Sequence, residues 1–235
     1  MKDTLRIRYG FDLPDGSKKH VDLRFDPKNF RLRNAAPADP PFWTELKFSQ
    51  CANCPLSADE HRHCPSALHM APAVESLKEL VSFDTVGVTV TQPERTVHAE
   101  TSAQQALSSV LGLIMATSGC PWTDRLRPMA RFHLPFASEA ETVYRSVCMF
   151  LLARELTGTA ESSGFAELKD LYDNLHGVNR DMSRRLGAAT RTDPARNAMA
   201  LLDSYTTLLP AALESQLTEL KPLFDAWRGV PISSI

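Results

Sequence analysis

LRIRYGFDLPDGSKKHVDLRFD, residues 5–26, alternates between apolar and polar side chains along most of its length. The alternation runs over 5–13 and again over 20–26, which is the period of a strand with one buried face. Between these runs, Asp15-Gly16 is a typical dipeptide of a tight hairpin turn. The segment therefore predicts an antiparallel β-hairpin whose apolar face lies in the core.

A second pair of strands is expected within residues 84–101, where valines alternate before a turn at Gln92-Pro93-Glu94. A short helix is expected at 73–82. From Ser102 onward, apolar residues recur at helical spacing.

Two of the later helices carry recognisable boundary signals. Ser138 and Glu141 form a capping-box pattern, which favours a helix through about residue 156. Asp193-Pro194 is typical of a helix start. We expect that helix to break at Pro210, because proline lacks the backbone N–H and its ring clashes with the preceding turn.

These patterns predict an α+β protein, with a small N-terminal antiparallel β-hairpin sheet and a cysteine-rich loop, followed by a mainly α-helical C-terminal half. A chain of 235 residues can bury one large core, and we expect a single domain over 1–235. The β-rich and cysteine-rich part spans 1–101 and the helical part 102–235. A helical subdomain that begins at 138 is the alternative.

Composition excludes several classes of protein. The hydrophobic content of 43% and the charged content of 23% are ordinary for a soluble globular protein. The formal net charge of −2 gives no general attraction to nucleic acid or anionic membranes. The apolar runs at 110–116 and 147–153 are too short to span a bilayer, and the first residues lack the apolar core of a signal peptide. We therefore expect a cytoplasmic protein whose partner, if it has one, is another protein.

The cysteines carry the strongest functional signal. Cys51 and Cys54 form a C-x-x-C pair, and Cys64 and Cys120 stand further along the chain. Cys54, Cys64 and Cys120 are each followed by proline, which stiffens the turn after each sulfur. The sequence predicts that these four thiolates hold one zinc ion, with an iron–sulfur cluster as the alternative cofactor. Cys148, in an apolar helical run, is expected to be a buried thiol instead.

A closed set of four cysteines is typical of a structural zinc site, so the first hypothesis is a binding or regulatory module. His63 is the alternative ligand if one cysteine does not bind. The second hypothesis is a metal-dependent enzyme, with Glu60, His61 or His63 as acid and base. Its anionic substrate would then bind to a basic cluster of three arginines, Arg125, Arg127 and Arg131. The third is an iron–sulfur or thiol redox sensor.

No familiar catalytic string, such as H-E-x-x-H, G-x-S-x-G or a P-loop, occurs in the sequence. The sequence therefore assigns no catalytic residue.

Three strings carry a family resemblance: CANCPL (51–56), TSGCP (117–121) and RPMARFHLPFASEAET (127–142). They resemble bacterial proteins that are grouped only as a domain of unknown function. The resemblance extends over about half of the chain and implies no activity.

Overall fold

The computed structural model describes residues 4–159, 164–189 and 193–227. Its four strands are β1 (Leu5–Asp12), β2 (Lys18–Phe25), β3 (Thr85–Thr91) and β4 (Thr96–Ser102). They form one antiparallel sheet in the order β2-β1-β3-β4, so the two hairpins expected from the sequence join through β1 and β3. Tyr9 marks the centre of this sheet, since it pairs with Val21 on β2 and with Val90 on β3.

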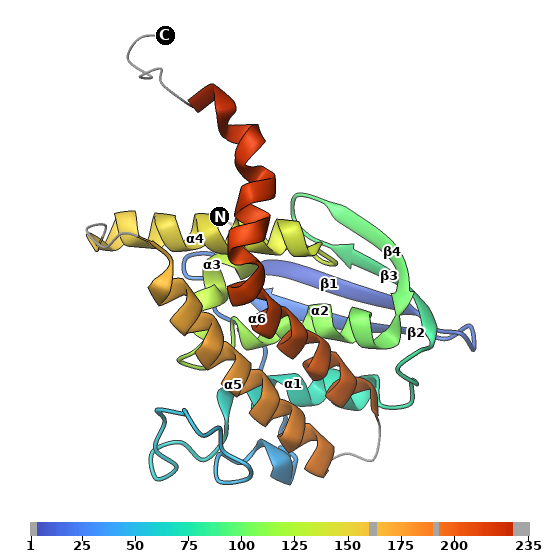
Figure 1. Ribbon diagram of the computed structural model, residues 1–235. Helices are drawn as coiled ribbons and strands as arrows, with labels where there is room; N and C mark the ends of the chain where they lie inside the picture. The colour runs from blue at the N-terminus through green and yellow to red at the C-terminus, as the bar shows by residue number, and fades with distance from the viewer. Residues whose placement is uncertain (1–3, 160–163, 190–192, 228–235) are drawn as a thin grey trace.

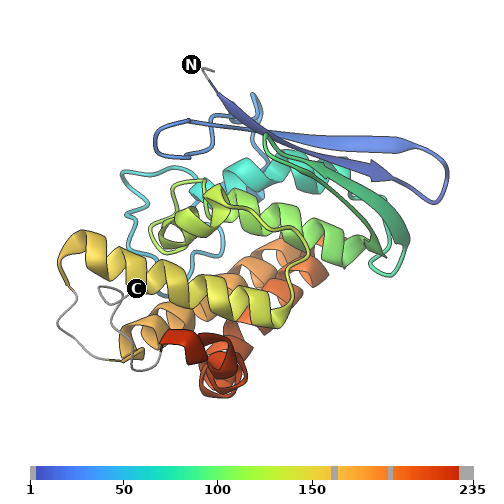
Figure 2. The ribbon, with the colours of Figure 1, turned by 90° about the horizontal axis from the view of Figure 1, so that it is seen from above.

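The helices form two further layers. Figure 2 shows the sheet on one side of the molecule, α1 (Pro65–Ser76) and α2 (Ala103–Met115) beneath it, and the remaining long helices beyond them. These are α4 (Glu139–Thr157), α5 (Ala166–Ala189) and α6 (Asp193–Leu220), whose far end stands away from the body in Figure 1. Short segments complete the chain: α3 (Arg127–Arg131) and the 3-10 turns η1 (Phe42–Thr44), η2 (Thr123–Leu126) and η3 (Lys221–Trp227). The predicted α+β class is confirmed.

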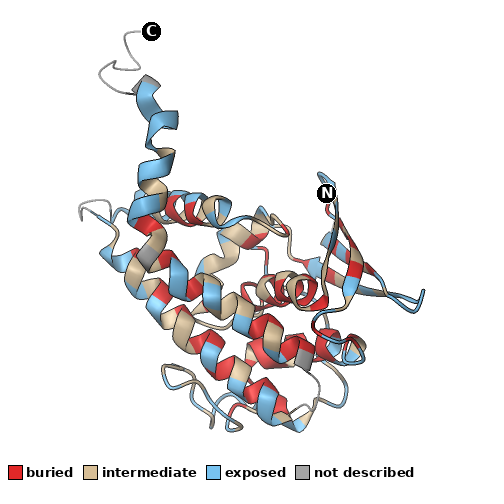
Figure 3. Cartoon of the chain, turned by 45° about the vertical axis from the view of Figure 1, so that its right-hand side comes forward, coloured by how far each residue is buried: buried red, intermediate tan, exposed pale blue. Residues whose placement is uncertain are grey.

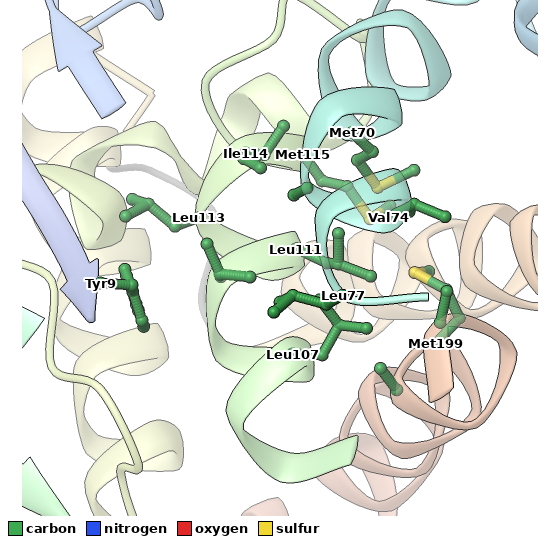
Figure 4. Close-up of a cluster of buried hydrophobic side chains, with 14 of the residues drawn as sticks. Tyr9, Met70, Val74, Leu77, Leu107, Leu111, Leu113, Ile114, Met115 and Met199 are labelled. Carbon is green, nitrogen blue, oxygen red and sulfur yellow. The ribbon is translucent and has the colours of Figure 1, made fainter. Parts of the chain in front are cut away.

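The larger hydrophobic cluster lies between the sheet and the α1–α2 layer. Ile7, Tyr9 and Phe11 of β1 are buried, as their alternation predicts. Figure 4 shows Tyr9 on one side of α2, with Leu107 and Leu111 turned to the opposite side. Helix α2 is therefore buried on several faces, which explains its nearly continuous apolar sequence.

A second hydrophobic cluster lies among α4, α5 and α6 and includes Val147, Leu168 and Leu213. Helices α5 and α6 contribute to both clusters, since Met182 and Met199 belong to the larger one. Helices on the C-terminal side of residue 138 therefore pack in the same cluster as the sheet. The single domain expected over 1–235, and its alternative of a subdomain from 138, stay predictions. The expected limits at 1 and 235 lie outside the described residues.

Three local expectations are wrong. The short helix expected at 73–82 is instead α1, which begins at Pro65 with Cys64 as its N-cap. Proline is well tolerated at the first helical position, where its missing N–H would have no partner in the helix. Helix α6 does not break at Pro210 but continues to Leu220. Packing of the neighbouring Leu209 and Leu213 in the second cluster offsets the cost of that proline.

Cys148 is the third correction. It is exposed on α4 instead of buried, because the buried face of that helix contains Val143 and Val147. The predicted capping box of Ser138 and Glu141 is confirmed at the start of the same helix.

Figure 3 shows that the far end of α6 is largely exposed, in contrast to the buried faces of the helices nearer the sheet. Within the described residues, no helix combines the length and the apolar character needed to cross a membrane.

Candidate functional site

Four cysteines from three separate segments line one small cavity. Cys51 and Cys54 lie in the loop before α1, where the N–H of Cys54 donates to the carbonyl of Cys51 over 3.0 Å. Cys64 is the N-cap of α1, and Cys120 follows α2. The cavity has a volume of about 20 Å³, which is room for little more than a single water molecule or ion. The four residues that the sequence singles out are therefore brought together at one place.

Their side chains do not form a finished metal site. Among the described residues, no group of three or more histidine, cysteine, aspartate or glutamate side chains is arranged to hold a metal ion. All four cavity cysteines have free thiols, and so does Cys148.

Burial keeps two of these thiols protonated. It raises the pKa of the Cys51 thiol to about 12, and the neighbouring Cys64 sulfur adds to that shift. Burial also raises the pKa of Cys64, although the N–H groups of Ala67 and Ser66 and the charge of Arg185 act in the opposite direction. A metal ion would displace these protons, because the thiolate and not the thiol is the ligand.

Arg185 of α5 is a buried cation in the wall of this cavity, and its side chain is 1% exposed. Nη1 donates to the carbonyls of Trp43 and Glu45 over 2.6 and 2.7 Å. Nη2 donates to the carbonyls of Leu46 and Ser49 over 3.3 and 3.1 Å. Within the described residues, Nε has no hydrogen-bond partner and the guanidinium forms no ion pair with an acid. Arg185 therefore fixes the backbone of 43–49 and leaves a positive charge beside the cysteines.

Two contacts position the C-x-x-C turn from outside. The carboxylate of Asp181, also on α5, accepts a hydrogen bond from the backbone N–H of Ala52 over 2.8 Å. The indole N–H of Trp122 donates to the carbonyl of Asn53 over 2.8 Å. The turn is thus held by α5 on one side and by the segment after Cys120 on the other.

The alternative ligand His63 is close to this region in sequence but has its own partner. Its Nδ1 shares a 2.8 Å hydrogen bond with the hydroxyl of Thr44. Glu60 and His61 are exposed, and none of these three residues lines the cysteine cavity.

The basic cluster divides among different partners. Arg127 pairs with Asp124 over 3.1 Å, and Arg131 pairs with Glu94 over 3.7 Å. Arg125 donates to the carbonyl of Pro121 over 3.0 Å and lies over the ring of Trp122. Anion binding by these arginines stays a prediction, and two of the three already have an acidic partner.

The sequence analysis missed Arg185 and Asp181. A signal for both was present: Arg185 follows Val178 by seven residues and Met182 by three, so it falls on the apolar stripe of the helix, and Asp181 lies next to that stripe. A charged residue within a buried stripe indicates a specific partner across the interface.

The chain matches a family described as "Domain of unknown function (DUF6901)" over residues 7–225. No curated protein and no solved structure matches it. Because the match extends over nearly the whole chain, including all four cavity cysteines, the protein belongs to the DUF6901 family.

Proposed function

We propose that the protein is a binding or regulatory module with a structural zinc ion, held by the thiolates of Cys51, Cys54, Cys64 and Cys120. The observation that carries this proposal is the convergence of these four residues, from three segments, on one ion-sized cavity. Four thiolates satisfy the tetrahedral preference of zinc.

The charge of the cavity wall supports the same proposal. A zinc ion with four thiolates carries a net charge of −2, and the buried guanidinium of Arg185 offsets part of it. Buried charges in proteins are usually paired. Arg185 has no acidic partner among the described residues, and thiolates in the adjoining cavity would supply one.

The role of such an ion would be to fasten the loop before α1 to the helices. The loop has little regular structure between η1 and α1, and its cysteines would be joined to the N-terminus of α1 and to the end of α2 through one metal ion. Structural zinc contributes directly to folding free energy.

The test is the metal content of the full chain, measured on wild type, Cys120→Ser and the matched control Cys148→Ser. Cys148 is exposed on α4 and does not line the cavity, so its replacement removes a thiol and none of the four proposed ligands. We expect about one zinc per chain in wild type and in the control, and a loss of zinc in Cys120→Ser. With a stability loss of about 3 kcal/mol, the melting temperature of Cys120→Ser falls by about 6–12 °C.

Equal metal content and equal melting temperature in the two variants would contradict the proposal. Iron with visible charge-transfer absorption, in place of zinc, would assign the four cysteines to an iron–sulfur cluster.

A further inference from the structure

A second and much larger cavity lies among α2, α3, α4, α5 and α6, at the seam between the two hydrophobic clusters. Its volume is about 210 Å³. For comparison, a buried cavity of about 150 Å³ accommodates benzene, so this one has room for a somewhat larger molecule. Most of its wall is apolar and includes Leu113, Leu126, Met129, Phe136, Leu175 and Leu202.

One side chain of this wall carries a charge. Arg145 of α4 is half-buried, and its Nη2 donates to the carbonyls of Met129 and Phe132 over 2.7 and 3.0 Å. These carbonyls hold the guanidinium in place but bring no full negative charge. Within the described residues, no carboxylate forms an ion pair with Arg145; Glu141, one helical turn away, is instead engaged by the N–H and hydroxyl of Ser138.

The other polar groups of the wall are neutral. Ser109 and His133 of the wall share hydrogen bonds with the hydroxyl of the buried Tyr9 behind them, over 2.8 Å to the Ser109 hydroxyl and 2.5 Å to Nε2 of His133. Burial, together with the charge of Arg145, lowers the pKa of His133 to about 3, so its ring is uncharged at neutral pH. The hydroxyl of Tyr172 is bonded to Ser146 over 2.6 Å. Arg145 is therefore the one ionised group among the described residues that line the cavity.

An apolar cavity with a single fixed cation selects for one chemical class of ligand. We propose that this cavity binds a small carboxylic acid with an apolar body, whose carboxylate pairs with Arg145 and whose hydrocarbon part lies among the leucines. A guanidinium presents several N–H donors in a planar fork, which matches a carboxylate. The volume suits an acid of roughly ten non-hydrogen atoms, by comparison with benzene. The site is separate from the cysteine cavity and does not depend on a metal.

The decisive comparison uses two ligands of the same shape. Calorimetric titration of the full chain with 3-phenylpropionate and with its amide measures the contribution of the charge. We expect the acid to bind at least about tenfold more tightly than the amide, since a charge-assisted hydrogen bond is about twice as strong as a neutral one. The same comparison of octanoate with octanamide tests whether the hydrocarbon part of the ligand is aliphatic instead of aromatic. Tighter binding of either acid than of its own amide supports the proposal.

Variants locate the site. In Arg145→Met the preference for acid over amide should disappear, whereas the matched control Arg62→Met, at an exposed arginine beside Glu45, should keep it. Ala137→Trp places a large ring in the cavity wall and should weaken the binding of acid and amide alike. If Arg145→Met does not fold, the ligand pair and Ala137→Trp still decide the question.

Three results would overturn the proposal. They are equal affinity of wild type for acid and amide in both ligand pairs, no binding of any of these ligands at millimolar concentration, or unchanged binding in Ala137→Trp.

Discussion

The carboxylate of Asp181 accepts a hydrogen bond from the backbone N–H of Ala52, 129 residues earlier in the chain. Asp181 is 4% exposed and also pairs with Arg180 and Arg184 on its own helix. Ala52 lies between the two cysteines of the C-x-x-C pair. A side chain of α5 therefore positions this turn by binding a backbone N–H of the turn. The turn therefore depends on a residue that the local sequence does not contain.

Replacement of Asp181 by alanine should destabilise the protein by about 2 kcal/mol, because it removes the hydrogen bond between the N–H of Ala52 and a buried, charged carboxylate. The same change should also weaken zinc binding if the four cysteines bind zinc. Urea unfolding and a competitive zinc titration measure the two effects. The matched control is Asp173→Ala, at an exposed position of the same helix, which should change stability by less than about 0.5 kcal/mol. Equal effects of the two substitutions would refute this role for Asp181.

Arg185→Met should be more disruptive, with a loss of about 3 kcal/mol, since four backbone carbonyls lose their common donor. Arg185→Lys should recover little of that loss, because an ammonium group cannot bridge four carbonyls as a planar guanidinium does. Denaturant unfolding gives both values. If lysine restored most of the stability, the charge of residue 185 would matter more than its hydrogen bonds.

The sheet could be predicted from the sequence because its signals are local. Tyr9 and its neighbours alternate strictly, and a tight turn separates the two strands of each hairpin. A register shift by one residue would expose the whole apolar face. The pairing of β1 with β3 could not be predicted, because it joins segments about 80 residues apart and depends on the packing of α1 and α2 on one face of the sheet.

The four cysteines could be selected as a set, since their residue type and the following prolines are visible in the sequence. The cavity that these cysteines line could not be predicted from the sequence. Its wall includes Arg185, which comes next to the cysteines only because α5 packs against the loop. The cavity around Arg145 could not be predicted either: the string 127–142 contributes His133, Phe136 and Ala137 to its wall, but the rest of the wall comes from helices that meet only in the folded chain. The predicted break of α6 at Pro210 is wrong because tertiary packing accommodates the proline inside the helix. The predicted limits of α1 are wrong because the helix already begins at Pro65, a position where proline is well tolerated.

His133 should make the stability of the protein depend on pH. Its pKa is about 3 in the folded chain, against an ordinary value of 6.5. Between these two values the unfolded chain binds a proton at residue 133 that the folded chain does not bind. The contribution of His133 to the free energy of unfolding is therefore complete above about pH 6.5 and is lost as the pH falls toward 3. The full shift would lower the free energy of unfolding by about 2 kcal/mol at pH 5. We expect a loss of about 1 kcal/mol, because His133 is only half-buried and solvent screens part of the cost of its charge. His133→Gln, which does not titrate, should lose less stability than wild type between pH 7 and pH 5, as measured by urea unfolding; parallel losses would contradict the assignment.

Gly177 offers a test of how closely the cysteine loop approaches α5. A methyl group at this position would lie 3.5 Å from Nδ2 of Asn53, which is an ordinary van der Waals distance. Alanine also favours the interior of a helix over glycine by up to about 1 kcal/mol. Gly177→Ala should therefore stabilise the protein by about 0.5 kcal/mol, and its thermal melting curve should shift upward.

The matched control is Gly16→Ala at the hairpin turn. Gly16 has φ of 81° and open space around it, so any effect there comes from backbone strain alone, and we expect a loss of about 1 kcal/mol. If Gly177→Ala were destabilising to a similar extent, the loop would have to lie closer to α5 than a methyl group allows, and the hydrogen bond from Asn53 to the carbonyl of Asn174 would be the contact to examine.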